Sequence, residues 1–520
     1  MKQQIKDKLP VLRVGHLAGV LLIMFSCLLS CEQKPARNKS YSTIPDAVVA
    51  EGKRLATIHC QGCHQLPDPS LLDVNSWENG VLPHMGPRLG IFKHNFKYYP
   101  SSRKDPALDT NYYPAEPQLK PAEWQTLMSY YLATAPDSMP AQNRDRINSR
   151  KIPGFAVVTP KLYYPDPAIS FISINLTLPQ PVLLNDIGTA RLYNIDRSLQ
   201  QTDSVASAGN IVDLEMDRDK YVLLDIGQLN PTNAKLGRII SGSHGGFSIP
   251  PTDSNLVIQS LARPVDLAVG DLNGDDRSDY VVCEFGNLTG SLSWIEDLGQ
   301  DKYQRHQLSA QPGAIKAWLQ DYNKDGLLDI WVLFAQGNES IMVYTNLGNG
   351  RFSSQQVLDF PAVYGSSYFE LADFNKDGFT DIVYTAGDNA DFSMVLKPYH
   401  GVYVFLNDGS NHFKQQYFFP IHGCFKAIAR DFDNDGDLDI AAISFFADYA
   451  RQPEEGFVYL QNQGNMKFEP HTTPETETGR WLTMDAGDID GDGNTDIILG
   501  NFSIRPADIK PAKNWRTGPP

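Results

Sequence analysis

The sequence of 520 residues has little cysteine and a deficit of positive charge. Its 6 cysteines are too few for a disulfide-stabilised scaffold, so their positions are more informative than their number. Lys and Arg number 45 against 61 Asp and Glu, a formal charge of −16, which argues against a nucleic-acid-binding protein with its basic face. A chain of this length indicates two or more domains, and 40 glycines with 35 prolines favour a turn-rich β protein.

Long hydrophobic runs are also missing, apart from one near the N-terminus. Residues 17–30 (LAGVLLIMFSCLLS) are apolar, but a helix that crosses a membrane needs about twenty such residues. Four basic side chains precede this run, and a basic segment followed by a short apolar one is typical of a secretory signal. The run ends in Leu28-Leu29-Ser30-Cys31, which resembles the lipobox of bacterial lipoproteins.

The lipobox resemblance implies that residues 1–30 are a signal peptide, that Cys31 is lipidated, and that residues 31–44 are a tether. Two or more acyl chains would be a firm anchor. We therefore expect an exported outer-membrane lipoprotein that faces the periplasm or the cell surface. An ordinary signal peptide with incidental cysteines and an uncleaved anchor are the alternatives.

A Cys-x-x-Cys-His motif, Cys60-Gln61-Gly62-Cys63-His64, is the attachment motif of c-type haem. Two thiols at this spacing add to the vinyl groups of the porphyrin, and the adjacent histidine ligates the iron. Chance gives roughly 0.0015 such motifs in a chain of this composition. A zinc site would need a second ligand pair, and the remaining cysteines, Cys283 and Cys424, are isolated. We expect those two to be buried free thiols.

Two helices are predicted on either side of this motif. Residues 46–58 place Val49, Leu55 and Ile58 on one face, and Pro121 opens a second helix that is rich in aromatic residues. Helix, haem motif, loop and closing helix together resemble a class I cytochrome c domain over residues 45–135.

In that family, a methionine before the last helix is the second axial ligand of the iron. The resemblance implies Met85, since no other methionine lies between the motif and the closing helix. A histidine and a methionine together favour electron transfer over oxygen chemistry. Ligation by His84 or His94 and an open iron site are the alternatives.

A nine-residue acidic pattern recurs five times in the C-terminal part, with spacings of 50, 52, 58 and 57 residues. Oxygen ligands at positions 1, 3, 5 and 9 and a backbone carbonyl at position 7 suit calcium. EF-hands are excluded, because position 12 is never glutamate. The predicted ligands are Asp271, Asn273, Asp275, Asp279, Asp321, Asn323, Asp325, Asp329, Asp373, Asn375, Asp377, Asp381, Asp431, Asp433, Asp435, Asp439, Asp488, Asp490, Asp492 and Asp496. Acidic hairpin turns without a metal are the alternative.

The copies and the Asn-x-Gly turns that follow them, such as Asn346-Leu347-Gly348, resemble the FG-GAP/VCBS repeats of the integrin-α-like β-propeller. Degenerate copies around residues 182–186 and 222–226 bring the implied number of blades to seven. No such turn follows the last copy, so the last blade is expected to be a strand short unless strands from 154–185 close the ring. A truncated C-terminus is the other explanation.

The predicted fold is therefore multidomain: a small all-α cytochrome c domain at 45–135, a linker at 136–153 and a seven-bladed all-β propeller at 154–520. The cofactors implied are one covalent haem c and up to five calcium ions.

The predicted function is one-electron transfer, with the propeller as a scaffold for a partner or ligand. Expected partners are a redox protein or a small electron donor or acceptor, a polysaccharide or surface protein at the propeller, and the membrane through the lipid. One alternative is an oxidoreductase whose propeller passes electrons to its own cytochrome, with His244, His400 and His422 as candidate catalytic groups. The other alternative is a glycan-binding or adhesion protein.

Overall fold

The computed structural model describes residues 37–144, 146–160, 162, 164–207, 209–217, 220–243, 256–390, 393–504 and 514–520. The predicted signal peptide, residues 31–36 of the predicted tether (Cys31 among them) and His244 lie outside these ranges. Within them, no helix is both long enough and apolar enough to span a membrane.

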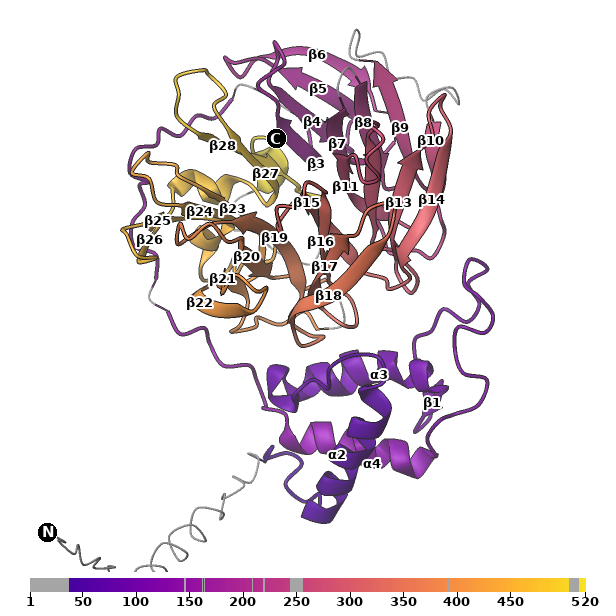
Figure 1. Cartoon of the computed structure of the whole chain (residues 1–520). Helices are drawn as coiled ribbons and strands as arrows, with labels where there is room; N and C mark the ends of the chain where they lie inside the picture. Colours follow the sequence, from indigo (N-terminus) through magenta and orange to yellow (C-terminus); the bar gives the residue numbers. More distant parts are fainter. Residues whose placement is uncertain are drawn as a thin grey trace, which may run out of the picture.

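The N-terminal part is helical and lies beside one end of the β structure (Figure 1). Its main helices, α2 and α4, were both predicted, and α2 extends two residues further than expected, to the first cysteine of the motif. The elements are α2 (Asp46–Cys60), η2 (Pro69–Leu71), the π-helix η3 (Ser76–Val81), α3 (Leu82–Met85), η4 (Gly86–Leu89), β1 (Lys93–His94), β2 (Lys97–Tyr98) and α4 (Pro121–Thr134).

Helices α2 and α4 cross at Gly52. A Cβ atom there would lie 2.3 Å from the Thr126 carbonyl oxygen and 2.7 Å from the Tyr130 Cβ. Because both of these atoms are fixed by the backbone of α4, no larger side chain fits between the helices at this separation. Gly52 therefore sets the distance between the two helices that frame the cysteine motif.

The prediction that Ile58 shares the buried face of α2 is wrong. Val49, Leu55 and Ala56 are buried there, whereas Ile58 is 56% exposed. At about 100° per residue, nine residues along a helix turn the chain by half a circle, so Ile58 points away from Val49.

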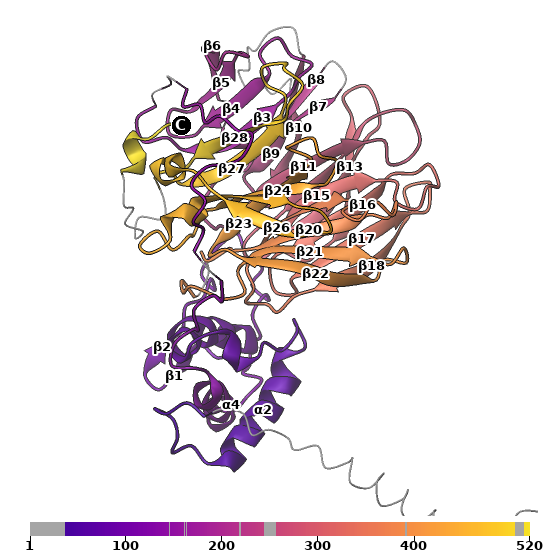
Figure 2. The ribbon, with the colours of Figure 1, turned by 90° about the vertical axis from the view of Figure 1, so that its left-hand side faces the viewer.

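The C-terminal part is a β-propeller with six four-stranded antiparallel blades and one two-stranded sheet (Figures 1 and 2). The first strand of each sheet packs against the first strand of the next around the centre. The first two blades are β3 (Ile169–Ile174), β4 (Val182–Asp186), β5 (Arg191–Ile195), β6 (Gln201–Ala206), and β7 (Ile211–Asp217), β8 (Lys220–Asp225), β9 (Gly237–Ser243), β10 (Leu256–Leu261). The two degenerate repeat copies are thus β4 and β8.

The next four blades follow the acidic pattern in the sequence. Their strands are β11 (Pro264–Gly270), β12 (Asp279–Glu284), β13 (Ser291–Asp297), β14 (Tyr303–Ser309); β15 (Ala314–Gln320), β16 (Asp329–Phe334), β17 (Ser340–Asn346), β18 (Phe352–Asp359); β19 (Ser366–Ala372), β20 (Asp381–Ala386), β21 (Gly401–Asn407), β22 (Phe413–Pro420); and β23 (Cys424–Arg430), β24 (Asp439–Ser444), β25 (Phe457–Asn462), β26 (Phe468–His471). The short helices η6 (Pro453–Gly456) and η7 (Pro474–Thr478) flank β25 and β26.

The last sheet contains only β27 (Trp481–Gly487) and β28 (Asp496–Asn501), followed by the short helix η8 (Trp515–Thr517). The expectation that strands from 154–185 complete this sheet is wrong, because β3 and β4 pair with β5 in a sheet of their own. The last sheet is instead joined to the first blade by a side-chain hydrogen bond and an isolated β-bridge. The Asp485 carboxylate accepts the Ile174 N–H at 2.7 Å, and Ala168 forms an isolated β-bridge with Phe502.

Carboxylates on the innermost strands tie neighbouring blades together in the same way elsewhere in the ring. Asp213 accepts the Leu267 N–H at 2.9 Å, and Asp266 accepts the Ala317 N–H at 2.7 Å. Glu370 similarly accepts from the N–H of Ala429. Each bond joins one blade's first strand to the next blade's first strand, so the blade order is fixed by polar as well as apolar contacts.

The connection between the two parts runs along the propeller surface. Arg144 and Arg146 form ion pairs with Glu455 and Glu454, which lie on η6. Further along, Ser149 forms an isolated bridge with His471 at the end of β26. Residues 136–153 are therefore docked against the blades at several points.

Candidate functional site

The Cys-x-x-Cys-His motif lies at the end of α2 and in the turn that follows. Cys60 is half-buried against the helical core, Cys63 is exposed, and both are free thiols. Burial, and to a lesser extent the neighbouring Cys63, raises the pKa of Cys60 to about 11. The two thiols are therefore unpaired and separated by one turn of chain.

The His64 ring is held in one orientation by the backbone. Its Nδ1 lies 2.8 Å from the Gln65 carbonyl oxygen, an acceptor, so Nδ1 carries the proton and donates it. The other nitrogen, Nε2, has no hydrogen-bond partner among the described residues. A metal-binding imidazole commonly donates its second N–H to a carbonyl in this way, so the geometry of His64 fits an iron ligand.

The segment with Met85 lies near the motif. Met85 ends α3, and three residues later the guanidinium of Arg88 is within electrostatic reach of Cys63. His94 is buried, and its Nε2 is bonded to the Gln125 side chain at 2.8 Å. His84 Nδ1 lies 2.7 Å from the Gly80 carbonyl oxygen in the π-helix. Of the two histidine candidates for the second axial position, His94 is therefore the one whose Nε2 is bonded to a side chain.

All five acidic loops connect the first strand of a sheet to its second strand. In each loop the carboxylate at position 1 accepts the backbone N–H of position 6, over 2.8–3.0 Å. Positions 4 and 6 have positive φ in every copy, which explains the glycine at position 6 in four of them. The first copy keeps the same turn with Asp276 at φ 63°.

The aspartate at position 9 has a structural role that the sequence did not reveal. In the four-stranded blades this side chain is fully buried and accepts the backbone N–H of the last residue of the third strand, for example Asn346 onto Asp329 at 2.7 Å. The Asn346 side chain then accepts the N–H of Gly348 at 2.9 Å. The acidic loop and the Asn-x-Gly turn are therefore one connected unit, which is why the two signals recur together.

Burial affects the acidity of these position-9 groups. It raises the pKa of Asp329, Asp381, Asp439 and Asp496, and it raises that of Asp279 to about 6. One oxygen of Asp329, Oδ2, is buried without a hydrogen-bond partner.

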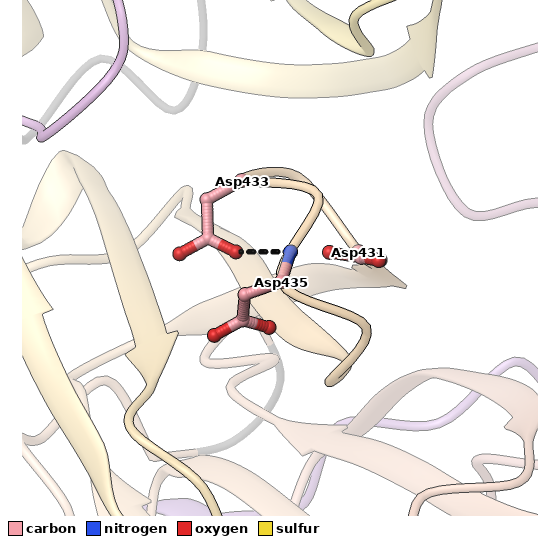
Figure 3. A group of neighbouring side chains, drawn as sticks. All are labelled: Asp431, Asp433 and Asp435. Atoms are coloured by element: carbon pink, nitrogen blue, oxygen red, sulfur yellow. Dashed lines mark hydrogen bonds between the residues drawn. The ribbon is translucent and has the colours of Figure 1, made fainter.

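Two of the loops gather three carboxylates around one point. Asp431, Asp433 and Asp435 can place one oxygen each within 4.8 Å of one another (Figure 3), and so can Asp488, Asp490 and Asp496. Asp431 Oδ1 is buried and lacks a hydrogen-bond partner. A divalent cation would satisfy that oxygen, so the donor set fits calcium.

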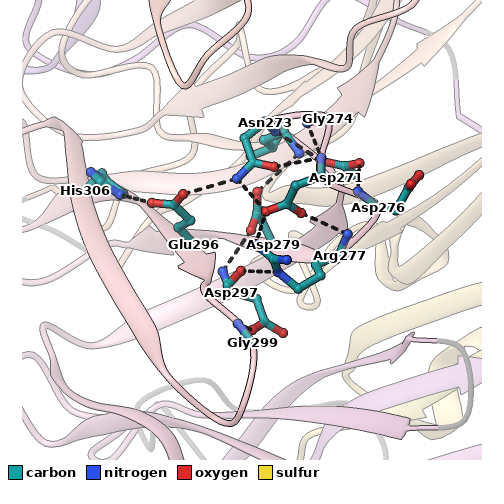
Figure 4. Close-up of polar contacts among 12 residues, drawn as sticks. Asp271, Asn273, Gly274, Asp276, Arg277, Asp279, Glu296, Asp297, Gly299 and His306 are labelled. Atoms are coloured by element: carbon teal, nitrogen blue, oxygen red, sulfur yellow. Dashed lines mark hydrogen bonds and ion pairs between the residues drawn. The ribbon is translucent and has the colours of Figure 1, made fainter.

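The first loop differs because it contains its own cation. Arg277, at position 7, forms an ion pair with Asp275 and also donates to the Asp297 carbonyl oxygen at 2.7 Å (Figure 4). Asn273 donates to Glu296, which is paired with His306. This guanidinium neutralises the carboxylate at position 5. In the other four loops, the carboxylate at position 5 forms no ion pair with a described arginine or lysine.

One group of residues was not predicted as a unit. Glu455, fully buried, pairs with Arg144 and accepts from His422 Nδ1 at 3.0 Å. His422 appeared only as an isolated candidate, because its partners lie 33 and 278 residues away in the chain. Cys283 and Cys424 are buried and free, as predicted.

Comparison with known families supports the repeat assignment. The model of the FG-GAP-like repeat matches residues 321–384 and 431–499, which include four of the five acidic loops in full. The chain carries FG-GAP-like repeats. Within each matched range, a loop is followed directly by the second strand of its sheet, so the FG-GAP signal and the propeller blades coincide.

Similar proteins cover only parts of the chain or resemble its fold weakly. Cartilage acidic protein 1 of Mus musculus is 31% identical over 169 residues, 31% of this chain and 24% of that protein. The chain thus matches about a quarter of the length of this relative. Among solved structures, the N-terminal domain of Nup159 has a TM-score of 0.41 at 12% identity, covering 69% of this chain and 96% of that one. Sqt1 of Saccharomyces cerevisiae has a TM-score of 0.41 at 12% identity, covering 66% and 97%.

Proposed function

We propose that this protein is an exported, lipid-anchored c-type cytochrome that transfers single electrons, with a calcium-stabilised propeller as its binding scaffold. The observation that carries the proposal is the motif at the end of α2. It combines two free thiols with an imidazole whose Nδ1 is held by a carbonyl and whose Nε2 is open. Lipidation at Cys31 and the outer-membrane location rest on the sequence alone.

In this proposal Cys60 and Cys63 hold one haem covalently, His64 ligates its iron, and Met85 provides the second ligand. A haem with these ligands supplies a one-electron redox couple. The chain's own contribution is to fix the site. The Gln65 carbonyl orients His64, and the contact of α2 with α4 at Gly52 supports the first cysteine. His94 is less suited to the iron, because its Nε2 already bonds Gln125.

The propeller serves as the scaffold for a partner or ligand. We propose that β27 and β28 form its seventh blade, since β27 packs between β23 and β3 and Asp485 bonds the first blade. Calcium in loops such as 431–439 would neutralise clustered carboxylates and hold the turns between strands. Candidate partners are a redox protein or small electron carrier near the helical part and a polysaccharide or surface protein on the propeller.

Covalent attachment of haem tests this proposal. The chain is produced in a host with haem-maturation machinery, and haem staining is compared between the wild type and the Cys60→Ser/Cys63→Ser variant after denaturing electrophoresis. We expect the wild-type band to stain and the variant band not to stain. A wild-type chain that is exported, folded and free of haem would contradict the proposal. Cys283→Ser, a change at a buried cysteine outside the motif, is the control and should stain normally.

Adhesion or glycan binding is the second candidate. The FG-GAP-like repeats and the partial match to Cartilage acidic protein 1 favour a binding role for the propeller. Glycan binding that persists in the Cys60→Ser/Cys63→Ser variant would favour this function over electron transfer. Reduction of the haem by a small substrate in the purified protein would instead favour the oxidoreductase alternative.

A further inference from the structure

A cleft of about 650 Å³ lies where the helical part, the linker and the propeller meet. Its walls come from all three: Asp73 from the helical part, Met139 and Gln142 from the linker, and His422 and Asp448 from the propeller. This volume is within the range of sites that bind small molecules, and such sites occur preferentially between domains.

The propeller side of the cleft is organised by Glu455. This buried carboxylate pairs with Arg144, and it accepts both the His422 Nδ1–H at 3.0 Å and the Asp448 backbone N–H at 3.3 Å. His422 is 5% exposed, and since its Nδ1 bonds Glu455, the second ring nitrogen is Nε2. It has no partner among the described residues. A buried charge pair thus fixes the direction of the imidazole.

Two other residues of the same cleft carry hydrogen-bond acceptors without a donor. Asp448 is 7% exposed, and its carboxylate forms no hydrogen bond or ion pair with any described residue. Gln142 donates its amide N–H groups to the carbonyls of His400 at 2.9 Å and Lys397 at 3.3 Å, which leaves Oε1 buried and unpartnered. Leaving a buried acceptor without a donor is costly. The Asp448 carboxylate and Gln142 Oε1 therefore favour a ligand with several N–H groups.

Charge and shape narrow the chemistry of the ligand. Asp448 forms no ion pair with a described residue. Two arginines line the cleft: Arg146 is paired with Glu454, and Arg451 forms no ion pair with Asp448. The remaining walls include the apolar side chains of Met139, Val395 and Leu396. We propose that the cleft binds a small primary amine, with its ammonium group donating to Asp448 and Gln142 and its alkyl part against the apolar wall. This inference rests on the scaffold role of the propeller and not on the haem.

Calorimetric titration of the full-length mature protein with n-butylammonium chloride, up to about 100 mM, tests the proposal, with 1-butanol as the neutral probe of equal length. We expect butylammonium to bind at least tenfold more tightly than 1-butanol. Asp448→Asn keeps the shape of the side chain and should weaken butylammonium binding at least tenfold. Asp359→Asn, the same change at an exposed site on β18, should have no effect.

Equal affinity for the amine and the alcohol, or unchanged amine binding in Asp448→Asn, would overturn the proposal. Since the Asp448 carboxylate has no polar partner in the described chain, this variant is expected to fold like the wild type, and its thermal midpoint checks that. Haem staining is measured on the same samples. If the wild type carries haem but does not bind the amine selectively, only the proposed amine site is refuted. If it binds the amine but carries no haem, only the proposed cytochrome function is refuted.

Discussion

The hydroxyl group of Tyr399, on the propeller, lies 2.9 Å from the carbonyl oxygen of Leu71, on the helical part. The Tyr399 ring also stacks on Tyr364, with ring centroids 4.6 Å apart. Val363 and Val395 pack against the core of the helical part around this contact. Since this part-buried hydrogen bond lies within an apolar contact, the two parts are held together at a defined point and not only by the linker.

Removing the Tyr399 hydroxyl should loosen this contact. We expect Tyr399→Phe to lose about 1 kcal/mol of docking free energy, because the part-buried hydrogen bond to Leu71 is lost while the ring stacking is kept. Hydrogen exchange of amides in residues 69–74 should become about fivefold faster. Tyr417→Phe is the control, because the Tyr417 hydroxyl has no hydrogen bond in the described structure. Equal exchange rates in both variants would show that the hydrogen bond does not hold the parts together.

The crossing of α2 and α4 should not tolerate a methyl group. Gly52→Ala is expected to destabilise the helical part by about 1–3 kcal/mol, because the new Cβ meets the backbone of α4 and the Tyr130 Cβ. Urea unfolding followed by circular dichroism measures the change. At Gly62 a Cβ would meet nothing within 4 Å, so Gly62→Ala should be nearly neutral. A neutral Gly52→Ala variant would mean that the helices are further apart than described.

Glu339 should make the propeller less stable as pH rises. Burial raises the pKa of this carboxyl to about 7, although the hydrogen bonds that it accepts from the backbone of Ser366 and Gly365 act to lower it. Between about pH 4.5 and 7 the unfolded chain releases this proton while the folded chain retains it, so stability falls with rising pH. The total loss is about 3 kcal/mol. Above pH 7 the penalty is complete.

Glu339→Gln cannot ionise, so its free energy of unfolding should lack this part of the pH dependence. The difference in stability between the variant and the wild type should grow in favour of the variant from pH 4.5 to 7 and then level off. Urea unfolding at several pH values measures it. A difference that is constant with pH would contradict the raised pKa.

The arginine of the first acidic loop should limit calcium binding. Arg277 neutralises Asp275, so we expect Arg277→Ala to bind one more calcium ion per chain than the wild type. Asp435→Asn, in the loop of Figure 3, should bind one fewer, since it removes a clustered carboxylate. Metal analysis after dialysis against calcium gives these counts. Asp437→Asn, at position 7 of the same loop, removes a side-chain charge but keeps the backbone carbonyl that would be the ligand, so it should leave the count unchanged.

Thermal unfolding with and without a chelator checks the same sites independently. Bound calcium raises the unfolding temperature, because it stabilises the folded state by mass action. If neither calcium counts nor unfolding temperatures differ among these variants, the acidic loops are hairpin turns without a metal.

Short-range patterns in the sequence predicted most of the fold. The period of the acidic copies revealed the blades, and Pro121 marked the start of α4, because both depend on residues close together in the chain. The sequence did not reveal whether the strands after residue 154 pair with β28 or with one another. Likewise, the approach of α4 to Gly52 depends on a distant segment.

The same difference between local and distant residues holds for the candidate sites. Cys60, Cys63 and His64 are recognisable because one turn of chain holds all three. The His422–Glu455–Arg144 group joins three distant segments, so no spacing in the sequence indicates it. The role of Asp329 in fixing the Asn346 turn also required the structure.

The visible spectrum of the mature protein, oxidised and reduced, tests the central claim most directly. We predict a low-spin c-type haem that is reducible in the wild type and becomes high-spin in Met85→Ala. His84→Ala serves as the matched variant and should retain the low-spin spectrum. A high-spin, ligand-accessible iron in the wild type, or an unchanged spectrum in Met85→Ala, would contradict the assignment of an electron carrier with these ligands.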